Sequence, residues 1–269
     1  MIAKIEAVER AALEDMVAAA PADLAARLGI EGAEVGTAYL ALAAKLPASA
    51  VVVNRTIGLG MGGPASREEV ALIVRRYREA GVARYFLHLH PEARPAEIAQ
   101  WCAAEGLERA RAWVKFARGR EAPPDAPTEL DIRLAGPAEA PAVGRIVAEA
   151  FDLGAAAAPW LAALVGRPGW RIFAGMDGDR LVGSGAMFVR DSVAYLDWGA
   201  TAPAARGRGC QSALLRARVL DALDLGCELI ATATGEEVAG DPQHSYSNIL
   251  RTGFRPEVTR LNLAPPKPG

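Results

Sequence analysis

In the second half of the chain, the spacing between hydrophobic residues changes several times between the spacing of a strand and that of a helix. Residues 130–134 alternate apolar with polar side chains, as in a strand, whereas residues 143–151 repeat apolar side chains at helical spacing. Asp177, Gly178 and Asp179 form a hairpin-type turn between two strand-like runs. The pattern predicts strands over residues 130–134, 170–176, 181–189, 193–201, 228–234 and 254–263, and helices over residues 143–151, 155–165, 212–224 and 245–251.

The first half is less regular. Its pattern predicts helix-rich sequence over residues 1–46, interrupted at Pro21 and residues 29–36, then a strand over residues 51–58, helices over 68–80 and 96–105, and strands over 85–89 and 112–116. The succession of strand, glycine-rich turn, helix, strand, helix and strand matches the order predicted for residues 193–263. This match suggests the same fold twice, with the first copy degenerate.

A proline-rich segment separates the halves. Three prolines fall within residues 123–127, where neither a helix nor a central strand accommodates them. We therefore predict a first domain over residues 1–118, a linker over 119–127 and a second domain over 128–269. The first domain is either a degenerate copy of the second or an accessory module for interaction or for covering a substrate. The predicted class is α/β, with a mixed sheet and helices on both of its faces.

Composition narrows the function classes. The 30 basic and 32 acidic residues give a formal net charge of -2, which provides no reason to expect binding to nucleic acid or to a membrane surface. No apolar run is long enough to span a bilayer, and the N-terminus lacks a signal-peptide core. The three cysteines lack metal-site spacing. These features predict a cytoplasmic protein without disulfides.

The junction between a predicted strand and a predicted helix carries the clearest chemistry. Gly207 and Gly209 allow the backbone to curl so that successive N–H groups point at one anion, and the helix that follows adds its positive dipole end. Arg206 and Arg208 can neutralise the remaining charge of a pyrophosphate. An ordinary glycine-containing turn is the alternative, but two interleaved arginines favour an anion site.

This junction resembles that of the GNAT acetyltransferases, which carry Gln/Arg-x-x-Gly-x-Gly/Ala there. Arg206 and Gly209 match the motif, whereas Gln211 replaces the expected small residue and would either crowd the phosphates or donate its amide to them. Thr201-x-Pro203 resembles the family's Val-x-Pro, and Gly253-Phe254 resembles its Gly-Phe. The resemblance covers residues 128–269, about half of the chain.

The resemblance implies a fold, a cofactor and its contacts. In that family the strand before the loop and the strand after its helix splay apart, and the pantetheine arm of acetyl-CoA lies in the split. Carried over, the pantetheine would meet the main chain of Trp198, Gly199, Ala200 and Thr201. The pyrophosphate would meet Arg206, Gly207, Arg208, Gly209, Cys210, Gln211 and Ser212.

The implied activity is transfer of an acetyl group from acetyl-CoA to a primary amine of a small molecule, with a peptide less favoured. Asp197 is the first candidate for the base, against a plain strand-end aspartate. The family often has a tyrosine as acid four residues before Gly253, where this chain has Ile249; Tyr246 or Tyr195 would replace it, or Ser245 or water. The alternative function is a CoA-binding or sensing protein that has lost turnover.

Two further expectations concern metals and stoichiometry. His88 and His90 are expected to be surface or packing residues, with no metal site, because no third ligand is in view. The glycines between Gly58 and Gly63 have no basic residue among them, and Pro64 removes an N–H group. We therefore predict one CoA site per chain, in a monomer built as a pseudo-dimer of its halves or in a homodimer.

Overall fold

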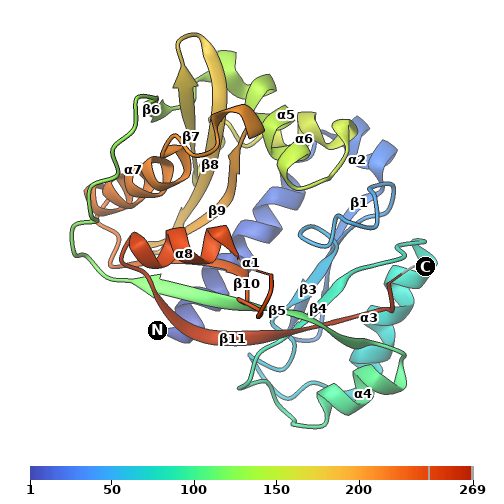
Figure 1. Ribbon diagram of the computed structural model, residues 1–269. Helices are drawn as coiled ribbons and strands as arrows, with labels where there is room; N and C mark the ends of the chain where they lie inside the picture. Colours follow the sequence, from blue (N-terminus) through green and yellow to red (C-terminus); the bar gives the residue numbers. More distant parts are fainter. Residues whose placement is uncertain (242, 268–269) are drawn as a thin grey trace. The chain divides into compact units, whose positions relative to one another are not determined.

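The computed structural model describes residues 1–241 and 243–267 (Figure 1). Its contacts group the chain into two compact units. Unit 1 contains Met1–Ala12 and Val114–Glu257, and unit 2 contains Leu13–Trp113 and Val258–Gly269. Each predicted domain was one continuous segment, before or after residues 119–127. Each observed unit instead contains two segments, one from each half of the chain.

Unit 1 is a mixed α/β unit with the strand order β5-β10-β9-β8-β7-β6. Strands β6 to β9 pair antiparallel, and β10 runs parallel to β9. Figure 1 shows α7 on one side of these strands and α5 and α6 on the other. The elements that lie wholly within unit 1 are β6 (Asp131–Leu134), α5 (Ala140–Ala150), α6 (Ala158–Ala162), β7 (Trp170–Asp177), β8 (Arg180–Arg190), β9 (Val193–Thr201), α7 (Cys210–Asp224), β10 (Leu229–Gly235) and α8 (His244–Arg251). Short 3-10 turns lie at Pro137–Glu139, Ala155–Ala157 and Pro203–Ala205.

Unit 2 has the strand order β1-β2-β3-β4-β11, with β5 beside β11. Its elements are α2 (Ala22–Leu28), β1 (Ile30–Val35), β2 (Ala38–Ala43), β3 (Arg55–Ile57), α3 (Arg67–Glu79), β4 (Phe86–Leu89) and α4 (Ile98–Ala104). Three elements contribute residues to both units: α1 (Ile2–Ala18), β5 (Glu108–Arg118) and β11 (Arg255–Ala264).

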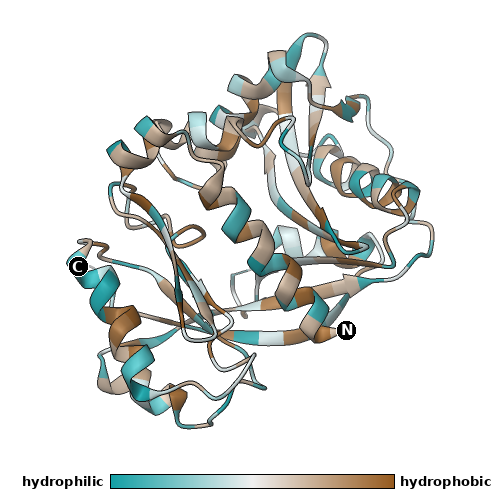
Figure 2. Ribbon diagram, turned by 180° about the vertical axis from the view of Figure 1, so that it is seen from behind, coloured by the Kyte–Doolittle hydropathy of each residue, from teal (hydrophilic) through white to brown (hydrophobic). Residues whose placement is uncertain are grey.

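Local sequence accounts for most of these elements. Gly178, at φ +58°, makes the predicted turn between β7 and β8. Helix α3 begins with a capping box between Ser66 and Glu69, and buries Val70, Ile73, Val74 and Tyr77 at helical spacing. Figure 2 shows hydrophilic and hydrophobic residues on the same helices, as expected of helices with one face on a core. None of the described helices is long and apolar enough to cross a membrane.

The prediction of helix-rich sequence up to residue 46 is wrong beyond α2. Residues Ile30–Val35 and Ala38–Ala43 form an antiparallel hairpin, with Gly36 at φ +56° in its turn. Alanine has the highest helix propensity, and all six residues of β2 are buried, so no polar alternation marked the strand. Strand pairing overrides local propensity here.

The strand predicted from residue 51 is shorter than expected. Val51–Val53 lie in a turn, where Val53 N–H donates to Ala50 O, and β3 begins only at Arg55. With β1 and β2 included, the chain repeats the order α-α-β-β-β-α-β-α-β in its two halves. The prediction of a mixed α/β fold is confirmed, and the repeated order of elements is longer than the sequence indicated.

Candidate functional site

The predicted anion loop joins β9 to α7 as a glycine turn. Gly207 and Gly209 both adopt positive φ, at +76° and +78°, and Gly209 stands at the N-cap of α7. Gly209 has no side chain to cap this helix end, and the described residues show no other side-chain cap, so its first N–H groups remain available to a ligand. A Cβ at Gly209 would lie 2.5 Å from Pro127 O, and Thr128 Oγ1 donates to Arg208 O at 2.8 Å. The loop is therefore held against the segment that precedes β6.

A cavity of about 600 Å³ opens at this helix end. It extends from the last residues of β9 to one face of α8, and Arg206 and Arg251 are among its lining residues. Its lining residues are Ala150, Gly199, Ala200, Thr201, Ala205, Arg206, Gly207, Gly209, Cys210, Gln211, Ser212, His244, Ser245, Asn248 and Arg251. Nine of the predicted cofactor-binding residues are among them, and Trp198 and Arg208 are the two that are not.

Arg208 is engaged elsewhere. Its Nη1 and Nη2 atoms donate to Asp177 Oδ2 and Oδ1 at 2.6 and 3.1 Å, forming a bidentate pair with the end of β7. This hydrogen bonding lowers the pKa of Asp177 and raises that of Arg208. The second cation of the cavity is Arg251, which the sequence analysis missed. Ser245, Asn248 and Arg251 recur every three residues on α8, and that spacing was the available signal.

Gln211 bridges the two helices that flank the cavity. Its Nε2 lies 3.3 Å from Ser245 Oγ, and its Oε1 accepts a hydrogen bond of 2.8 Å from Asn248 Nδ2. Asn248 Oδ1 in turn accepts from Arg251 Nη2 at 2.6 Å. The side chain that departs from the family motif thus belongs to a polar chain along the cavity wall.

The strands β9 and β10 diverge beside the cavity. Their parallel pairing runs from Val193 with Leu229 to Leu196 with Thr232 and goes no further. A bulge in β9 follows at once, where the register with β8 shifts and Trp198 adopts φ +50°. Such a conformation is strained for a tryptophan. Gly199, Ala200 and Thr201, which follow the divergence, line the cavity.

A buried arginine supports the bulge. Arg218 Nη1 donates to Ala186 O at 3.0 Å and to Asp197 O at 3.2 Å, and its guanidinium fills the space beside Gly185. Burial lowers the pKa of Arg218 to about 10, against the opposite influence of Asp197. Nothing in the one-dimensional pattern of α7 identified this residue, because its partners are backbone carbonyls far away in sequence.

The structure places the three catalytic candidates in different surroundings. Asp197 is half-buried at the bulge, and its Oδ1 accepts the N–H of Trp198 at 2.8 Å. Tyr246 packs edge-on against Phe116, with ring centroids 4.9 Å apart. Tyr195 is buried, and its hydroxyl lies 3.1 Å from Glu9 Oε1. Among the described residues that line the cavity, none is one of these three.

The corresponding helix start in unit 2 is already occupied by its own chain. The hydroxyl of Ser66 accepts from Glu69 N–H, and the carboxylate of Glu69 accepts from Ser66 N–H. Gly60 O accepts from Arg94 N–H, and a Cβ at Gly60 would lie 2.6 Å from Arg94 O. A carboxylate at the helix start repels a second anion. This arrangement supports the prediction of a single CoA site.

His88 in β4 and His90 just after this strand are buried rather than at the surface, with 1% and 4% of their area exposed. The ring of His88 lies against Trp113, with 5.0 Å between the ring centroids. The expectation of a packing role therefore agrees with the structure, and the expectation of a surface position does not.

Solved structures with the same fold include GNAT proteins. A GCN5-related N-acetyltransferase from Kribbella flavida superposes over 91% of this chain and 95% of its own, with a TM-score of 0.62 and 17% identity. One from Sphaerobacter thermophilus covers 87% and 82%, with a TM-score of 0.58 and 17% identity. A tandem GNAT protein from the clavulanic acid biosynthesis pathway covers 78% and 74%, with a TM-score of 0.53 and 17% identity.

No protein-family model and no curated protein matches the sequence. At this level of identity the comparison establishes the fold. The chain has the GNAT acetyltransferase fold, and the superpositions extend over both of its halves.

Proposed function

We propose that this protein is an acetyl-CoA-dependent N-acetyltransferase that acts on a primary amine of a small molecule. One observation carries the proposal. The start of α7, where the N-cap residue Gly209 provides no side-chain cap, opens into a cavity lined by Arg206, Arg251 and the last three residues of β9. Helix N–H groups and two cations suit a pyrophosphate, and the part of β9 beyond its pairing with β10 suits the amide groups of a pantetheine arm.

The reaction requires a neutral amine, because a protonated nitrogen has no lone pair. An alkyl ammonium has a pKa of about 10.4, so a base must take its proton near neutral pH. In our proposal Asp197 is that base. The nitrogen then attacks the thioester carbonyl, the C–S bond breaks, and Tyr246 or water gives a proton to the CoA thiolate and regains one from the nitrogen as the amide forms. Tyr195 is the weaker candidate for this acid, because its buried hydroxyl donates to Glu9.

A second function has support from two positions. Ile249 stands where the family often has a tyrosine that acts as the general acid, and Gln211 occupies the place of a small residue in the loop. Both changes favour a CoA-binding or sensing protein that keeps the fold without turnover.

The test is a calorimetric titration with CoA and acetyl-CoA, followed by a panel of amines assayed by release of free thiol. Binding together with thiol release that depends on one amine class supports the enzyme. Tight binding without thiol release from any amine selects the sensing function. No binding of either ligand contradicts both.

A further inference from the structure

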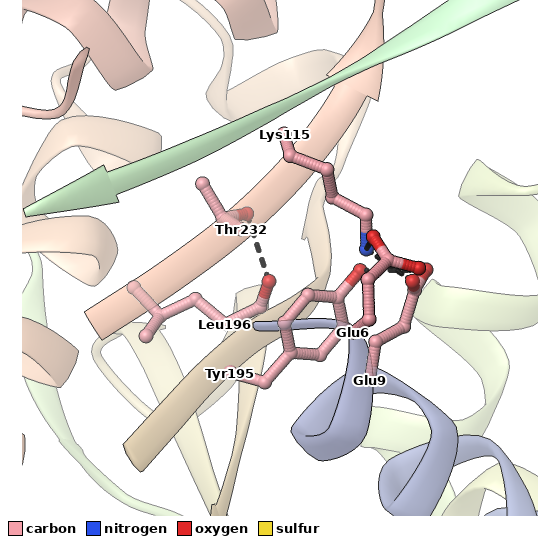
Figure 3. Close-up of polar contacts among 6 residues, drawn as sticks. All are labelled: Glu6, Glu9, Lys115, Tyr195, Leu196 and Thr232. Carbon is pink, nitrogen blue, oxygen red and sulfur yellow. Dashed lines mark hydrogen bonds and ion pairs between the residues drawn. The ribbon is translucent and has the colours of Figure 1, made fainter. Parts of the chain in front are cut away.

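A cluster of charged side chains is buried in unit 1 beside β9 (Figure 3). Glu9 and Lys115 are fully buried, and Tyr195 is 2% exposed. Glu9 comes from α1, Lys115 from β5 and Tyr195 from β9. Three segments that are far apart in the sequence therefore meet at one point within this unit.

Glu9 connects the other two residues. Its Oε1 accepts a hydrogen bond of 3.1 Å from the Tyr195 hydroxyl, and its Oε2 forms an ion pair with Lys115 Nζ. The ammonium group also lies 5.2 Å from the centre of the Tyr195 ring, and Glu6 Oε1 is 3.8 Å from Lys115 Nζ. Both carboxylate oxygens of Glu9 are thus engaged, as Figure 3 shows.

Stability alone is a weak reason for such a cluster. Removing charges from water is costly, and apolar residues of similar volume often stabilise a core at least as well as a buried ion pair. Buried polar contacts do, however, fix one geometry, because their directions and partners are specific. The location of the cluster indicates which geometry it fixes.

The cluster lies where β9 is about to leave β10. Tyr195 pairs with Ala231, and the next pair, Leu196 with Thr232, is the last one. The Thr232 hydroxyl donates to Leu196 O at 2.8 Å, which reinforces this last pair (Figure 3). One residue further along, Asp197 begins the bulge.

We propose that Glu9 is a positioning residue of the acetyl-transfer site. Through Tyr195 and Lys115 it fixes β9 at the base of the split, so that the bulge at Trp198 and the main chain after it hold one orientation toward the thioester. The inference rests on the proposed function. Glu9 itself lies away from the substrate, and a residue of the N-terminal helix completes a site otherwise built from the second half.

The test compares Tyr195→Phe, Glu9→Ala, Glu9→Gln and the double variant Glu9→Ala/Tyr195→Phe. Tyr77→Phe is the matched control, because it removes a buried hydroxyl in unit 2 that bonds to Ala41 O at 3.0 Å. For each variant, kcat, the KM for acetyl-CoA, the Kd for CoA and the Tm are measured. Amide hydrogen exchange of residues 196–200 is measured as well.

The inference predicts that Tyr195→Phe and Glu9→Ala each lower kcat about tenfold, with the Kd for CoA changed less than twofold. Glu9→Gln, whose amide oxygen still accepts the Tyr195 bond, should keep more activity than Glu9→Ala. The double variant should be no slower than Glu9→Ala, because one connection is removed in each case. Tyr77→Phe should change Tm and leave kcat unaltered.

A kcat for Tyr195→Phe within twofold of the wild type overturns the inference, as does an equal loss in Tyr77→Phe. If Glu9→Ala does not fold, Tyr195→Phe and Glu9→Gln decide. If the wild type binds acetyl-CoA without turnover, exchange decides: residues 196–200 should exchange at least tenfold faster in Tyr195→Phe, and unchanged exchange overturns the inference. Failure of the wild type to bind acetyl-CoA contradicts the proposed function instead.

Discussion

Asn248 donates a hydrogen bond of 2.8 Å from its side-chain amide to Gln211 Oε1, and so ties α8 to the first turn of α7. With the contact between Gln211 and Ser245, this bond places a carboxamide at the position where the GNAT motif has a small residue. The helix end that suits a phosphate is therefore narrowed by the protein's own side chain.

Gln211→Ala should tighten CoA binding. Removing the carboxamide widens the phosphate site, and CoA then has no bond between the helices to break on entry. One net hydrogen bond of about 1 kcal/mol corresponds to about a fivefold change in Kd, which calorimetry resolves. Weaker binding by Gln211→Ala would show instead that the amide donates to the phosphates.

Arg206 and Arg251, which line the cavity, should matter more for CoA binding than Arg208, the other arginine of the loop. Arg206→Ala and Arg251→Ala should each weaken CoA binding about tenfold, the loss expected for a charge-assisted hydrogen bond. Arg208→Ala is the control, because its guanidinium is held by Asp177, and its Kd should stay within twofold of the wild type. A larger loss in Arg208→Ala than in Arg251→Ala would contradict this assignment.

The variant Asp197→Asn distinguishes the role of Asp197 as a base from its role in holding the bulge of β9. The asparagine carbonyl can still accept the Trp198 N–H group, so the bulge is preserved while the proton acceptor is lost. We expect turnover to fall at least a hundredfold, within the range for general base catalysis, with the Kd for acetyl-CoA unchanged. Turnover equal to that of the wild type would remove Asp197 from the mechanism.

Gly183→Ala tests the packing that positions the helix start. The added methyl group would lie 2.3 Å from Cys210 Sγ and 3.1 Å from a Leu214 methyl group, which forces α7 away from β8. Overpacking of this kind costs about 1–3 kcal/mol of unfolding free energy. We expect a lower Tm and weaker CoA binding, whereas Gly62→Ala, with no neighbour nearer than 3.6 Å, should change neither.

The sequence predicted the second half of the fold closely, because its elements are strongly periodic and its turns are marked by glycine. It failed for β1 and β2. Strand β2 is alanine-rich and fully buried, so it carries no alternation, and β1 buries only its two end residues. It did not anticipate that Met1–Ala12 belongs to unit 1, since such grouping depends on contacts between distant segments.

The sequence predicted the backbone loop of the candidate site, but it predicted only some of the side chains that line the cavity and not the partners that these side chains have. Gly207 and Gly209 adopt the positive φ that the motif required. The partner of Arg208 lies 31 residues away on β7, and Arg251 reaches the cavity from another helix, so neither role follows from the loop's own sequence. Pairings of this kind are set by tertiary structure.

The most direct test of the central claim is a calorimetric titration of the wild-type chain and of the Arg206→Ala/Arg251→Ala variant with acetyl-CoA. We predict one site per wild-type chain, because the start of α3 is closed by Ser66 and Glu69 whereas that of α7 is open. Binding by the double variant should be at least a hundredfold weaker. Two sites per chain, no binding by the wild type, or undiminished binding by the variant would contradict the account.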